Sequence, residues 1–428
     1  MSNHYTSFDQ YGFMHLPAHL AQYDLIEILR EILFEFDWLQ AKLNATDVDA
    51  LVADFEHIKD DAELSLVQDA FRLARHVLDE DKTQLGNQLL GRLLSYKMPG
   101  IQMILNPIRQ EITVPWLRPL TATLTPPGTP LIGVLSGHTD WVKSVVVTLD
   151  GARIISGSDD GRIKVWNSYN GDNVLTIPIQ RGGGLNIAVT PDGTRIISWS
   201  GDGSIKVWNS YNGDNTLTIP IQRGGGRTVA VTTDGTRVIG DNGDYNLKIW
   251  DINNGKELLT LSGHRNTIFS IAVLPDGKRA ISTSLDQTLK LWDITKGYEL
   301  FTLRGHTGKI GSVAVTPDGK RAVSASEDKT LKVWDLTTGK ALFTFFGHNG
   351  WVNSAAVLPD GTQAISGSSD GTLKVWDIFN GKELFTLSGH NTPVTSVVVT
   401  PDGKRAISAD NTGTMKIWDL KKGKNIQD

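Results

Sequence analysis

The dominant hydrophobic pattern in this sequence is a unit of 42 residues that recurs from residue 131 to the C-terminus. Within one unit, residues 268–273 form a near-continuous apolar run, which is typical of a strand buried on both faces. Shorter runs at 279–283, 288–292 and 299–303 indicate three further strands. A unit of four strands cannot bury both faces alone, so such units must pack radially around an axis. One tryptophan ends the third strand of every unit: Trp166, Trp208, Trp250, Trp292, Trp334, Trp376 and Trp418.

Two further markers keep the same spacing. An Asp-Gly pair lies 16 residues before each tryptophan, and Asp-Gly between apolar runs is a strong signal for a hairpin turn. A Gly-His pair lies 28 residues before five of the tryptophans, and a Trp-Asp pair ends five of the units. This frame resembles the WD-repeat family. The resemblance implies an all-β fold, a seven-bladed β-propeller over residues 130–428.

The two ends of the repeat region complement each other. The seventh unit stops at Asp428, where its outer strand should begin. Residues 130–135 directly precede the first Gly-His pair, in the place that residues 300–303 occupy before a later one. We therefore expect residues 130–135 to complete the last blade and close the ring. Closure of this kind removes an exposed strand edge that invites aggregation.

Each complete unit carries a histidine, a serine, an aspartate and the tryptophan at fixed spacing. The serine lies ten residues before the tryptophan and the aspartate six. The resemblance implies that these side chains form a hydrogen-bonded tetrad within each blade, since buried indole and imidazole groups need partners. Ser, His and Asp also compose nucleophilic triads, but sets in separate blades lie too far apart to serve one substrate. The sets are His138, Ser156, Asp160, Trp166; His264, Ser282, Asp286, Trp292; His306, Ser324, Asp328, Trp334; and His348, Ser366, Asp370, Trp376.

Three units depart from the tetrad pattern. The second has Gln180 in the histidine position, and the third has Gln222 and Gly240 in place of histidine and serine. The seventh has Thr412 where the aspartate belongs. We expect the second and third blades to form the least stable sector of the ring.

A partner site is expected on one face of the propeller. By resemblance, propellers bind partners on the face formed by the outer-to-inner loops and the turns between the second and third strands. Several positions there carry large apolar side chains, and exposed apolar and aromatic groups mark interfaces. Alternatively, the N-terminal region covers some of them, or they pack among themselves. The predicted partner-binding residues are Trp141, Lys143, Leu185, Arg227, Phe269, Leu285, Lys309, Trp351 and Asn353.

A basic loop patch of Arg181, Arg223 and Arg265 is a second candidate site. Arg-Gly-Gly-Gly runs at 181–184 and 223–226 offer guanidinium and backbone N–H groups to an acidic surface or a phosphate. The same runs are also typical of glycine loops with solvated arginines. Basic residues elsewhere are not interleaved with aromatic ones, which argues against nucleic acid as a partner.

Residues 1–113 differ from the repeat region, because their apolar residues have the spacing of helices and not of strands. Thr46 is placed to cap the second of the expected helices. The pattern predicts an antiparallel helical bundle or short solenoid, and the proline-rich stretch 114–129 predicts a semi-rigid linker. Apolar stripes with helical spacing cover residues 25–39, 48–55, 64–77 and 85–94.

Residues 16–20 (LPAHL) and 36–43 (FDWLQAKL) resemble the helical arm of the apoptosis protease-activating factor family. The resemblance implies an arm that joins a nucleotide-binding switch to a propeller sensor. The sequence has no G-x-x-x-x-G-K-[ST] phosphate loop, so it does not contain the switch itself. The chain is then either the C-terminal sensor part of a longer protein or a stand-alone relative.

The amino-acid composition excludes several kinds of functional site. The chain has no cysteine, which excludes disulfides, thiolate metal sites and cysteine nucleophiles and agrees with a cytoplasmic location. No apolar run approaches the ~20 residues of a membrane span. The net charge of -5 combines an acidic helical region with a slightly basic repeat region. No spacing of residues indicates a cofactor or a metal.

These observations favour a non-enzymatic recognition module that binds a protein partner on the propeller face. By resemblance it would sense a ligand for, or hold inactive, a nucleotide-binding switch domain in the same longer protein. The alternative is a propeller enzyme or small-ligand binder with its site at the axial channel.

Overall fold

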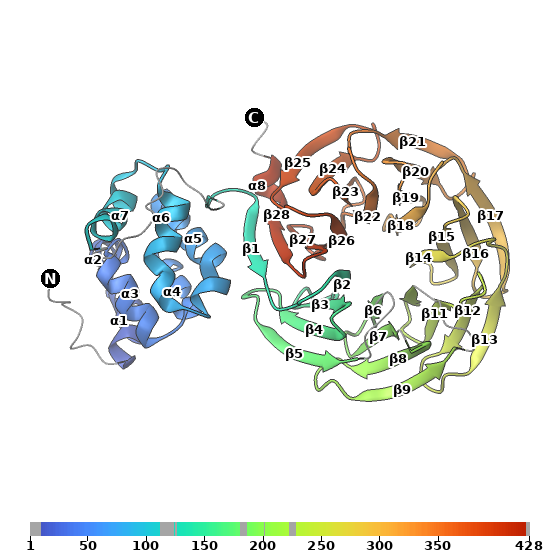
Figure 1. The fold of residues 1–428 in the computed structure, drawn as a ribbon, viewed down its shortest axis with the longest axis horizontal. Helices are drawn as coiled ribbons and strands as arrows, with labels where there is room; N and C mark the ends of the chain where they lie inside the picture. Colours follow the sequence, from blue (N-terminus) through green and yellow to red (C-terminus); the bar gives the residue numbers. More distant parts are fainter. Residues whose placement is uncertain are drawn as a thin grey trace. The chain divides into compact units, whose positions relative to one another are not determined.

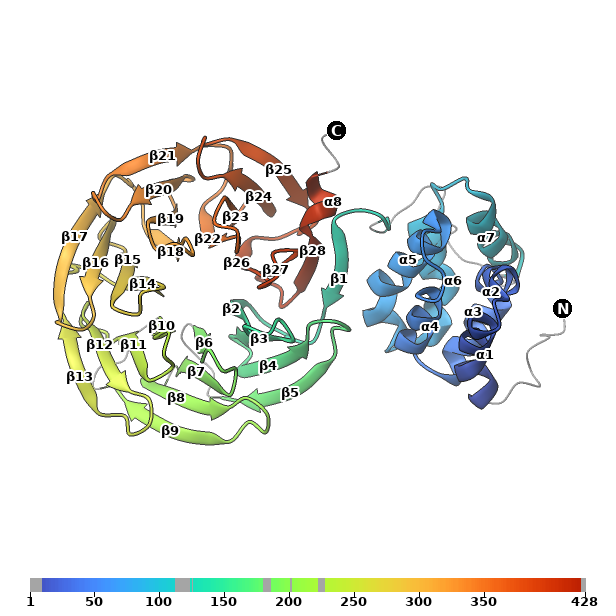
Figure 2. The same ribbon diagram turned by 180° about the vertical axis from the view of Figure 1, so that it is seen from behind.

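The computed structural model describes residues 10–111, 124, 126–179, 186–200, 202–221 and 228–424. The chain divides into two compact units, Met1–Val134 and Leu135–Asp428. The first is helical, and the second is a β-propeller (Figures 1 and 2).

The helical unit is built around one apolar core. Leu29, Trp38, Leu51 and Phe71 are among its fully buried members, and each lies on an apolar stripe visible in the sequence. The helices are α1 (Gln10–Gln22), α2 (Ile26–Leu33), α3 (Phe36–Ala45), α4 (Val48–Phe55), α5 (Ala62–Leu78), α6 (Leu85–Leu93) and α7 (Pro99–Glu111), with a 3-10 turn η1 (Lys82–Gln84).

Two details of the predicted helices are wrong. The stripe over residues 25–39 is not one helix, because the N–H groups of Phe34 and Glu35 bond three residues back and end α2. Thr46 does not cap α4: its hydroxyl donates to the Lys42 carbonyl at the end of α3. Asp47 is the cap, since its carboxylate accepts the N–H of Ala50 at 2.8 Å.

The prediction missed α1 and α7, and both contain an internal proline. Pro17 and Pro107 each remove one helical hydrogen bond, which makes a helix the less expected structure at these positions. The burial of apolar side chains on these helices outweighs the lost hydrogen bonds. The buried side chains are Phe13, Pro17, Ile104 and Ile108.

The described part of the proline-rich stretch lies against the helical unit. Leu124 donates its N–H to the Gly91 carbonyl of α6 at 3.0 Å. The Tyr96 hydroxyl donates to the Pro127 carbonyl at 2.7 Å, and the N–H of Gly128 donates to Asp69 of α5 at 3.3 Å. Residues 112–123 and 125, which hold the rest of the predicted linker, lie outside the described residues.

In the described part of the chain, the strands form seven four-stranded antiparallel sheets arranged as blades (Figure 1). Blades 1 to 3 are β2 (Val142–Val147), β3 (Arg153–Ser158), β4 (Arg162–Asn167), β5 (Asn173–Pro178); β6 (Ile187–Val189), β7 (Arg195–Ser200), β8 (Ser204–Asn209), β9 (Asn215–Pro220); and β10 (Val229–Val231), β11 (Arg237–Asp241), β12 (Leu247–Asp251), β13 (Glu257–Leu261). Blades 4 and 5 are β14 (Ile268–Val273), β15 (Arg279–Ser284), β16 (Thr288–Asp293), β17 (Tyr298–Arg304); and β18 (Ile310–Val315), β19 (Arg321–Ser326), β20 (Leu331–Asp335), β21 (Ala341–Phe345). Blade 6 and the remaining strands are β22 (Val352–Val357), β23 (Gln363–Ser368), β24 (Thr372–Asp377), β25 (Glu383–Ser388); and β26 (Val394–Val399), β27 (Arg405–Asp410), β28 (Met415–Asp419), followed by the short helix α8 (Leu420–Lys424).

The seventh sheet takes its outer strand from the start of the repeat region. Its strand order is β1-β28-β27-β26, with β1 (Leu131–Leu135) in the outer position expected from the sequence for residues 130–135. Leu131 and Leu135, at the two ends of β1, are buried.

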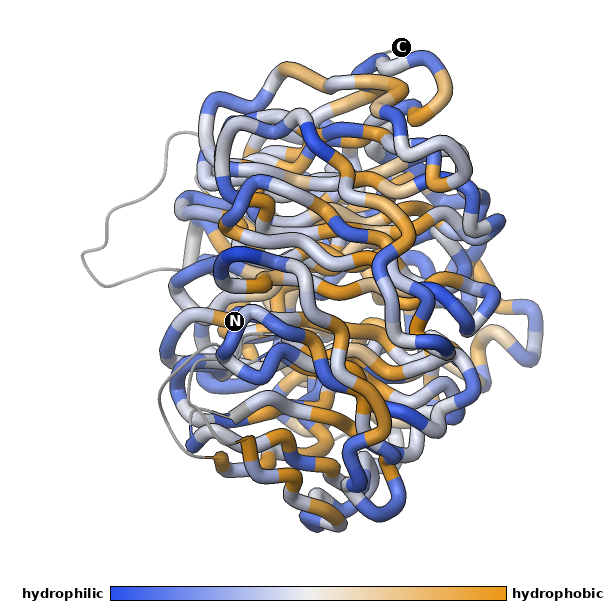
Figure 3. The backbone as a smooth tube through the Cα atoms, turned by 90° about the vertical axis from the view of Figure 1, so that its right-hand side faces the viewer, coloured by the Kyte–Doolittle hydropathy of each residue, from blue (hydrophilic) through white to orange (hydrophobic). Residues whose placement is uncertain are grey.

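The Asp-Gly pairs form the turns between the first two strands of the blades. In blade 1, Asp150 accepts the Thr148 hydroxyl at 2.5 Å and the N–H of Ala152 at 2.9 Å. Gly151 has φ +70°, a left-handed conformation that glycine adopts without strain. In Figure 3, hydrophobic positions lie along much of the interior of the tube and hydrophilic positions along many of the outer loops.

Candidate functional site

Counted over the described residues, five blades contain a buried tetrad. In blade 5, His306 Nδ1 lies 2.7 Å from Asp328 Oδ2, and its Nε2 lies 2.7 Å from Ser324 Oγ. The indole Nε1 of Trp334 donates to the same Oγ at 2.8 Å. Equivalent contacts of 2.7–2.9 Å join His138, Ser156, Asp160 and Trp166; His264, Ser282, Asp286 and Trp292; and His348, Ser366, Asp370 and Trp376.

The hydrogen-bond roles in a tetrad follow from the groups present. A carboxylate only accepts, so the imidazole Nδ1 carries the proton and donates it. The Nε2 then accepts the serine hydroxyl, whose oxygen accepts the indole N–H. Each serine of these tetrads is fully buried, so its oxygen is beyond the reach of a substrate. The tetrads hold the strands of a blade together and do not form nucleophilic sites.

Blade 7 has a complete tetrad, and the expectation that Thr412 leaves it incomplete is wrong. Asp410, two residues earlier at the end of β27, lies 2.9 Å from His390 Nδ1. His390 Nε2 is 2.6 Å from Ser408 Oγ, which accepts the Trp418 indole N–H at 2.8 Å. Thr412 donates both its N–H and its hydroxyl to Asp410, so it supports the carboxylate that it was thought to replace.

Blades 2 and 3 differ from the others. Trp208 Nε1 still donates to Ser198 Oγ at 2.8 Å in blade 2. In blade 3, a Cβ at Gly240 would lie only 3.0 Å from Ile205 Cδ1, so this position has no room for serine without a shift. The inner strands β6 and β10 have three residues, against six in the other blades. Gln180 and Gln222 lie outside the described residues.

Trp199 links these two blades, and no sequence marker singled it out. It is 2 % exposed, and its Nε1 donates to the Asp241 carbonyl of blade 3 at 3.4 Å. The equivalent position is occupied by Gly157 in blade 1 and by Gly367 in blade 6. The large indole therefore fills space at the sector that lacks the standard tetrads.

The buried histidines make stability depend on pH. Burial lowers the pKa of His138, His348 and His390 even though each faces a carboxylate, so the folded chain favours their neutral forms. The unfolded chain takes up these protons below about pH 6.5. As the pH falls below that value, each such histidine lowers the free energy of unfolding by on the order of 1.4 kcal/mol per pH unit. The decrease stops once the pH reaches the pKa of that histidine in the folded chain.

We therefore expect the free energy of unfolding to be highest above about pH 7 and to fall as the pH drops below about 6.5. Urea unfolding followed by circular dichroism above and below that pH measures the effect. An unfolding free energy that is the same above and below it would contradict the expectation.

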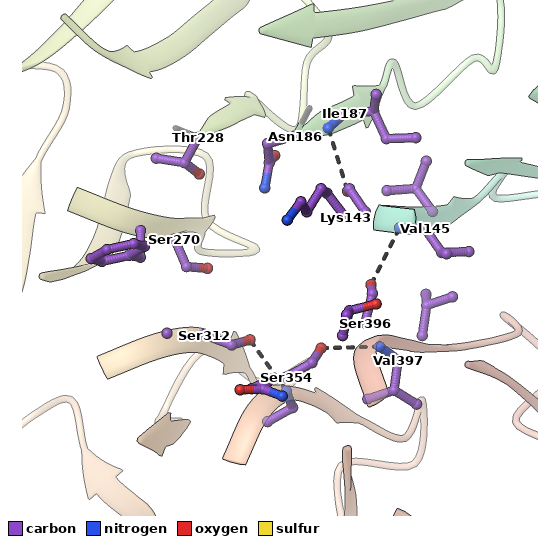
Figure 4. Close-up of a pocket in the computed structure, with 18 of the residues that line it drawn as sticks. Lys143, Val145, Asn186, Ile187, Thr228, Ser270, Ser312, Ser354, Ser396 and Val397 are labelled. Atoms are coloured by element: carbon purple, nitrogen blue, oxygen red, sulfur yellow. Dashed lines mark hydrogen bonds between the residues drawn. The ribbon is translucent and has the colours of Figure 1, made fainter. Parts of the chain in front are cut away.

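A cavity of about 1230 Å³ lies at the centre of the propeller and is lined by the inner strands of all seven blades in the described part of the chain. At one level, polar side chains link neighbouring inner strands at six of the seven blade boundaries in the described part of the chain. Ser354 accepts the N–H of Val397 at 3.0 Å, and Ser396 accepts that of Val145 at 3.2 Å (Figure 4). Equivalent bonds of 3.2–3.4 Å run from Ile187 to Ser144, Val229 to Asn186, Val313 to Ser270 and Ala355 to Ser312.

The sequence carries a signal for these inter-blade bonds that the predicted site residues did not include. A small polar residue recurs at intervals of 42 at positions 144, 186, 228, 270, 312, 354 and 396. Within a predicted apolar inner strand such residues break the hydrophobic pattern. At six of these positions, all except Thr228, the side chain joins neighbouring blades in the described part of the chain.

Two exposed tryptophans stand at the cavity mouth. Trp141 of blade 1 is 46 % exposed and Trp351 of blade 6 is 53 % exposed, and both line the cavity. Lys143 lies 4.0 Å from the centre of the Trp141 ring and pairs with Asp159 at 3.1 Å. The structure thus brings these predicted partner-binding residues to one edge of the cavity.

Phe269 and Lys309 form a second cluster at the mouth. The Lys309 ammonium lies 4.4 Å from the centre of the Phe269 ring and pairs with Glu327 at 2.7 Å. Asn353 also lines the cavity and donates to Ser369 Oγ at 3.0 Å.

Of the remaining predicted positions, Leu285 and Arg265 lie within the described residues. Leu285 is 41 % exposed but is not among the residues that line the cavity. Leu185 and Arg227 lie outside the described residues, as do Arg181 and Arg223 of the basic loop patch. Arg265 is exposed, and its backbone N–H donates to the tetrad residue Asp286 at 2.9 Å.

Among the described residues, no group of three or more histidines and carboxylates could hold a metal ion. No helix in the described part of the chain is both long and apolar enough to cross a membrane.

Seven four-stranded blades with internal tetrads define a WD-type propeller, a fold that generally serves interaction and not catalysis. The WD domain, G-beta repeat model matches residues 129–167, 184–209, 255–293, 297–335, 339–377 and 381–419, so the chain belongs to the WD-repeat family. Residues 210–254 lie outside that match, although their strands complete blade 2 and form most of blade 3. The APAF-1 helical domain model matches residues 2–91.

Two curated relatives share part of the chain. NACHT domain- and WD repeat-containing protein 1 of Mus musculus is 28% identical over 166 residues, which is 36% of this chain and 11% of that protein. The Homo sapiens protein of the same name is 26% identical over 166 residues, 36% of this chain and 10% of its own length. The match thus covers about a tenth of these relatives.

Proposed function

We propose that the cavity mouth of the propeller binds a protein partner, with Trp141 and Trp351 as its anchors. The observation that carries the proposal is their exposure of 46 % and 53 % at the rim of one cavity. The seven repeat tryptophans, by contrast, are buried in the blades. Tryptophan is enriched among the residues that dominate binding energy, and large rings supply apolar area at low entropic cost.

The ion pairs at the mouth support this assignment. Lys143 lies over the Trp141 ring and Lys309 over the Phe269 ring, and each lysine pairs with a carboxylate, so these two aromatic side chains of the rim are held by their neighbours. A rim held in place loses less conformational entropy on binding.

Capture of partners from cell extract by the full chain, quantified by mass spectrometry, tests the site. We expect Trp141→Ala and Trp351→Ala each to weaken binding of identified partners by about thirtyfold, the effect of a hot-spot side chain. Tyr169→Ala is the control, since Tyr169 is 74 % exposed in the turn between β4 and β5, away from the cavity. Partners captured equally by all three variants would remove the proposed site.

We further propose that this chain is the recognition part, or a stand-alone relative, of a signal-transduction ATPase. The APAF-1 helical domain match and the NACHT domain named in both relatives support this reading. The transcript around the coding region tests it: a phosphate-loop domain upstream in the same reading frame marks a longer protein. An upstream domain of unrelated type would contradict the ATPase connection.

A further inference from the structure

The serines of the inter-blade links leave donors facing the cavity. We call Ser144, Ser270, Ser312, Ser354 and Ser396 the serine ring. Each Oγ accepts a backbone N–H from the next blade, and among the described residues its own hydroxyl proton has no acceptor. All five serines line the cavity, so these protons are available to an occupant.

Asn186 adds a stronger donor beside Ser144. Its Oδ1 accepts the N–H of Val229 at 3.4 Å, which fixes the orientation of the amide. The two protons of Nδ2 then face the cavity, and Figure 4 shows this nitrogen directed inward. Lys143 lines the same cavity and is labelled with Asn186 in Figure 4, so blades 1 and 2 contribute three donor groups to one cavity.

The carboxylates at the mouth are already engaged. Asp159 pairs with Lys143, and Glu327 pairs with Lys309. Each lysine has three donor protons and keeps some after forming one ion pair. Among the described residues, the donors of Lys143, Ser144 and Asn186 are therefore not all satisfied. An occupant gains most by bringing acceptors to them.

We infer that the partner segment is an acidic peptide, whose carboxylate side chain enters the cavity at Lys143, Ser144 and Asn186 while neighbouring apolar residues contact Trp141 and Trp351. The inference rests on the proposed function and specifies the chemistry of its partner. A carboxylate matches the sector because it only accepts hydrogen bonds, and bonds to an ionised acceptor are the stronger kind.

A library of random 12-residue peptides displayed on phage provides the probe, selected on the full chain and counter-selected on the Trp141→Ala/Trp351→Ala variant. We expect Asp and Glu to be enriched relative to Lys and Arg in the peptides retained. Exchange of the enriched Glu for Gln in a synthetic copy should weaken binding about tenfold, as loss of charge-assisted bonds does. Enrichment of basic residues, or equal binding of the Glu and Gln peptides, would overturn the inference.

Asn186→Asp is the decisive variant. It keeps the oxygen that accepts the Val229 N–H but replaces the inward donor by an acceptor of negative charge. We expect binding of the selected acidic peptide to weaken more than tenfold. Asn173→Asp, at an exposed position of the outer strand β5, adds the same charge and should leave binding unchanged.

The outcomes separate the two proposals. Peptides that lose binding with Trp141→Ala but bind Asn186→Asp like the parent chain leave the mouth as the site and reject the acidic chemistry. If no peptide that binds the full chain survives counter-selection on the Trp141→Ala/Trp351→Ala variant, both proposals are rejected. If Asn173→Asp weakens peptide binding as much as Asn186→Asp does, the effect comes from net charge. The cavity sector of Lys143, Ser144 and Asn186 is then rejected as the binding site.

Discussion

Replacing Lys42 by methionine is expected to destabilise the helical unit by about 3–5 kcal/mol. Lys42 on α3 and Asp54 on α4 form an ion pair in the core, with both side chains nearly inaccessible. Burial raises the pKa of Asp54 to about 6, while attraction to Lys42 opposes the rise. Burial likewise lowers the pKa of Lys42. Without the lysine, the unfavourable burial of the carboxylate is no longer offset.

The effect should depend on pH in a definite direction. In Lys42→Met the folded pKa of Asp54 rises further, so protonation relieves the burial of charge as the pH falls. The loss of unfolding free energy is then larger at about pH 8 than at about pH 5. Hydrogen exchange by mass spectrometry on peptides of α3, α4 and α5 measures it within the helical unit.

Two variants make the test specific to the buried charge. The double variant Lys42→Met/Asp54→Leu should recover most of the stability, because replacing a whole buried pair by apolar groups is often neutral. Arg30→Met breaks the more exposed pair with Asp61 and should cost less, about 1 kcal/mol. A double variant as unstable as Lys42→Met alone would show that packing, not charge, causes the loss.

Asp410→Ala is expected to destabilise the propeller by about 3–4 kcal/mol. Burial alone would raise the pKa of Asp410, but hydrogen bonds from His390 and Thr412 lower it to about 2, so the group is a carboxylate. Its removal leaves the buried His390 Nδ1 and the N–H groups of Thr412 and Thr414 without their acceptor.

Thr412→Ala is the matched control, because it removes only one hydroxyl that donates to Asp410. We expect a loss of about 1 kcal/mol or less. Urea unfolding at neutral pH compares the two variants. If Thr412→Ala costs as much as Asp410→Ala, the aspartate does not complete the tetrad of blade 7.

The tetrads show how far fixed spacing carries a prediction. Spacing located the four residues of blades 1, 4, 5 and 6 because each repeat is one structural unit with the same register. In blade 7 it failed by two residues, since a carboxylate at position 410 reaches the same histidine by another path. Sequence register fixes the backbone position of a residue but not where its side chain ends.

The helical unit shows a similar limit. Four apolar stripes identified α2 to α6, because amphipathic helices must place apolar residues on the buried face. The breaks and caps at residues 34–35 and 47 depend on single hydrogen bonds that leave no periodic trace. Helices α1 and α7 were hidden by internal prolines whose cost is offset by burial.

The sequence by itself determined the number of blades, the turns and the tetrad residues of four blades, because a strict 42-residue period forces each unit into the same environment. It also marked Trp141 and Trp351 as apolar groups in loops. Only the tertiary structure decided that they share the rim of one cavity with Lys143 and Lys309. The ring of inter-blade bonds and the donors of Asn186 and the serines arise there too, because such groups are 42 residues apart and meet only when the blades pack around one axis.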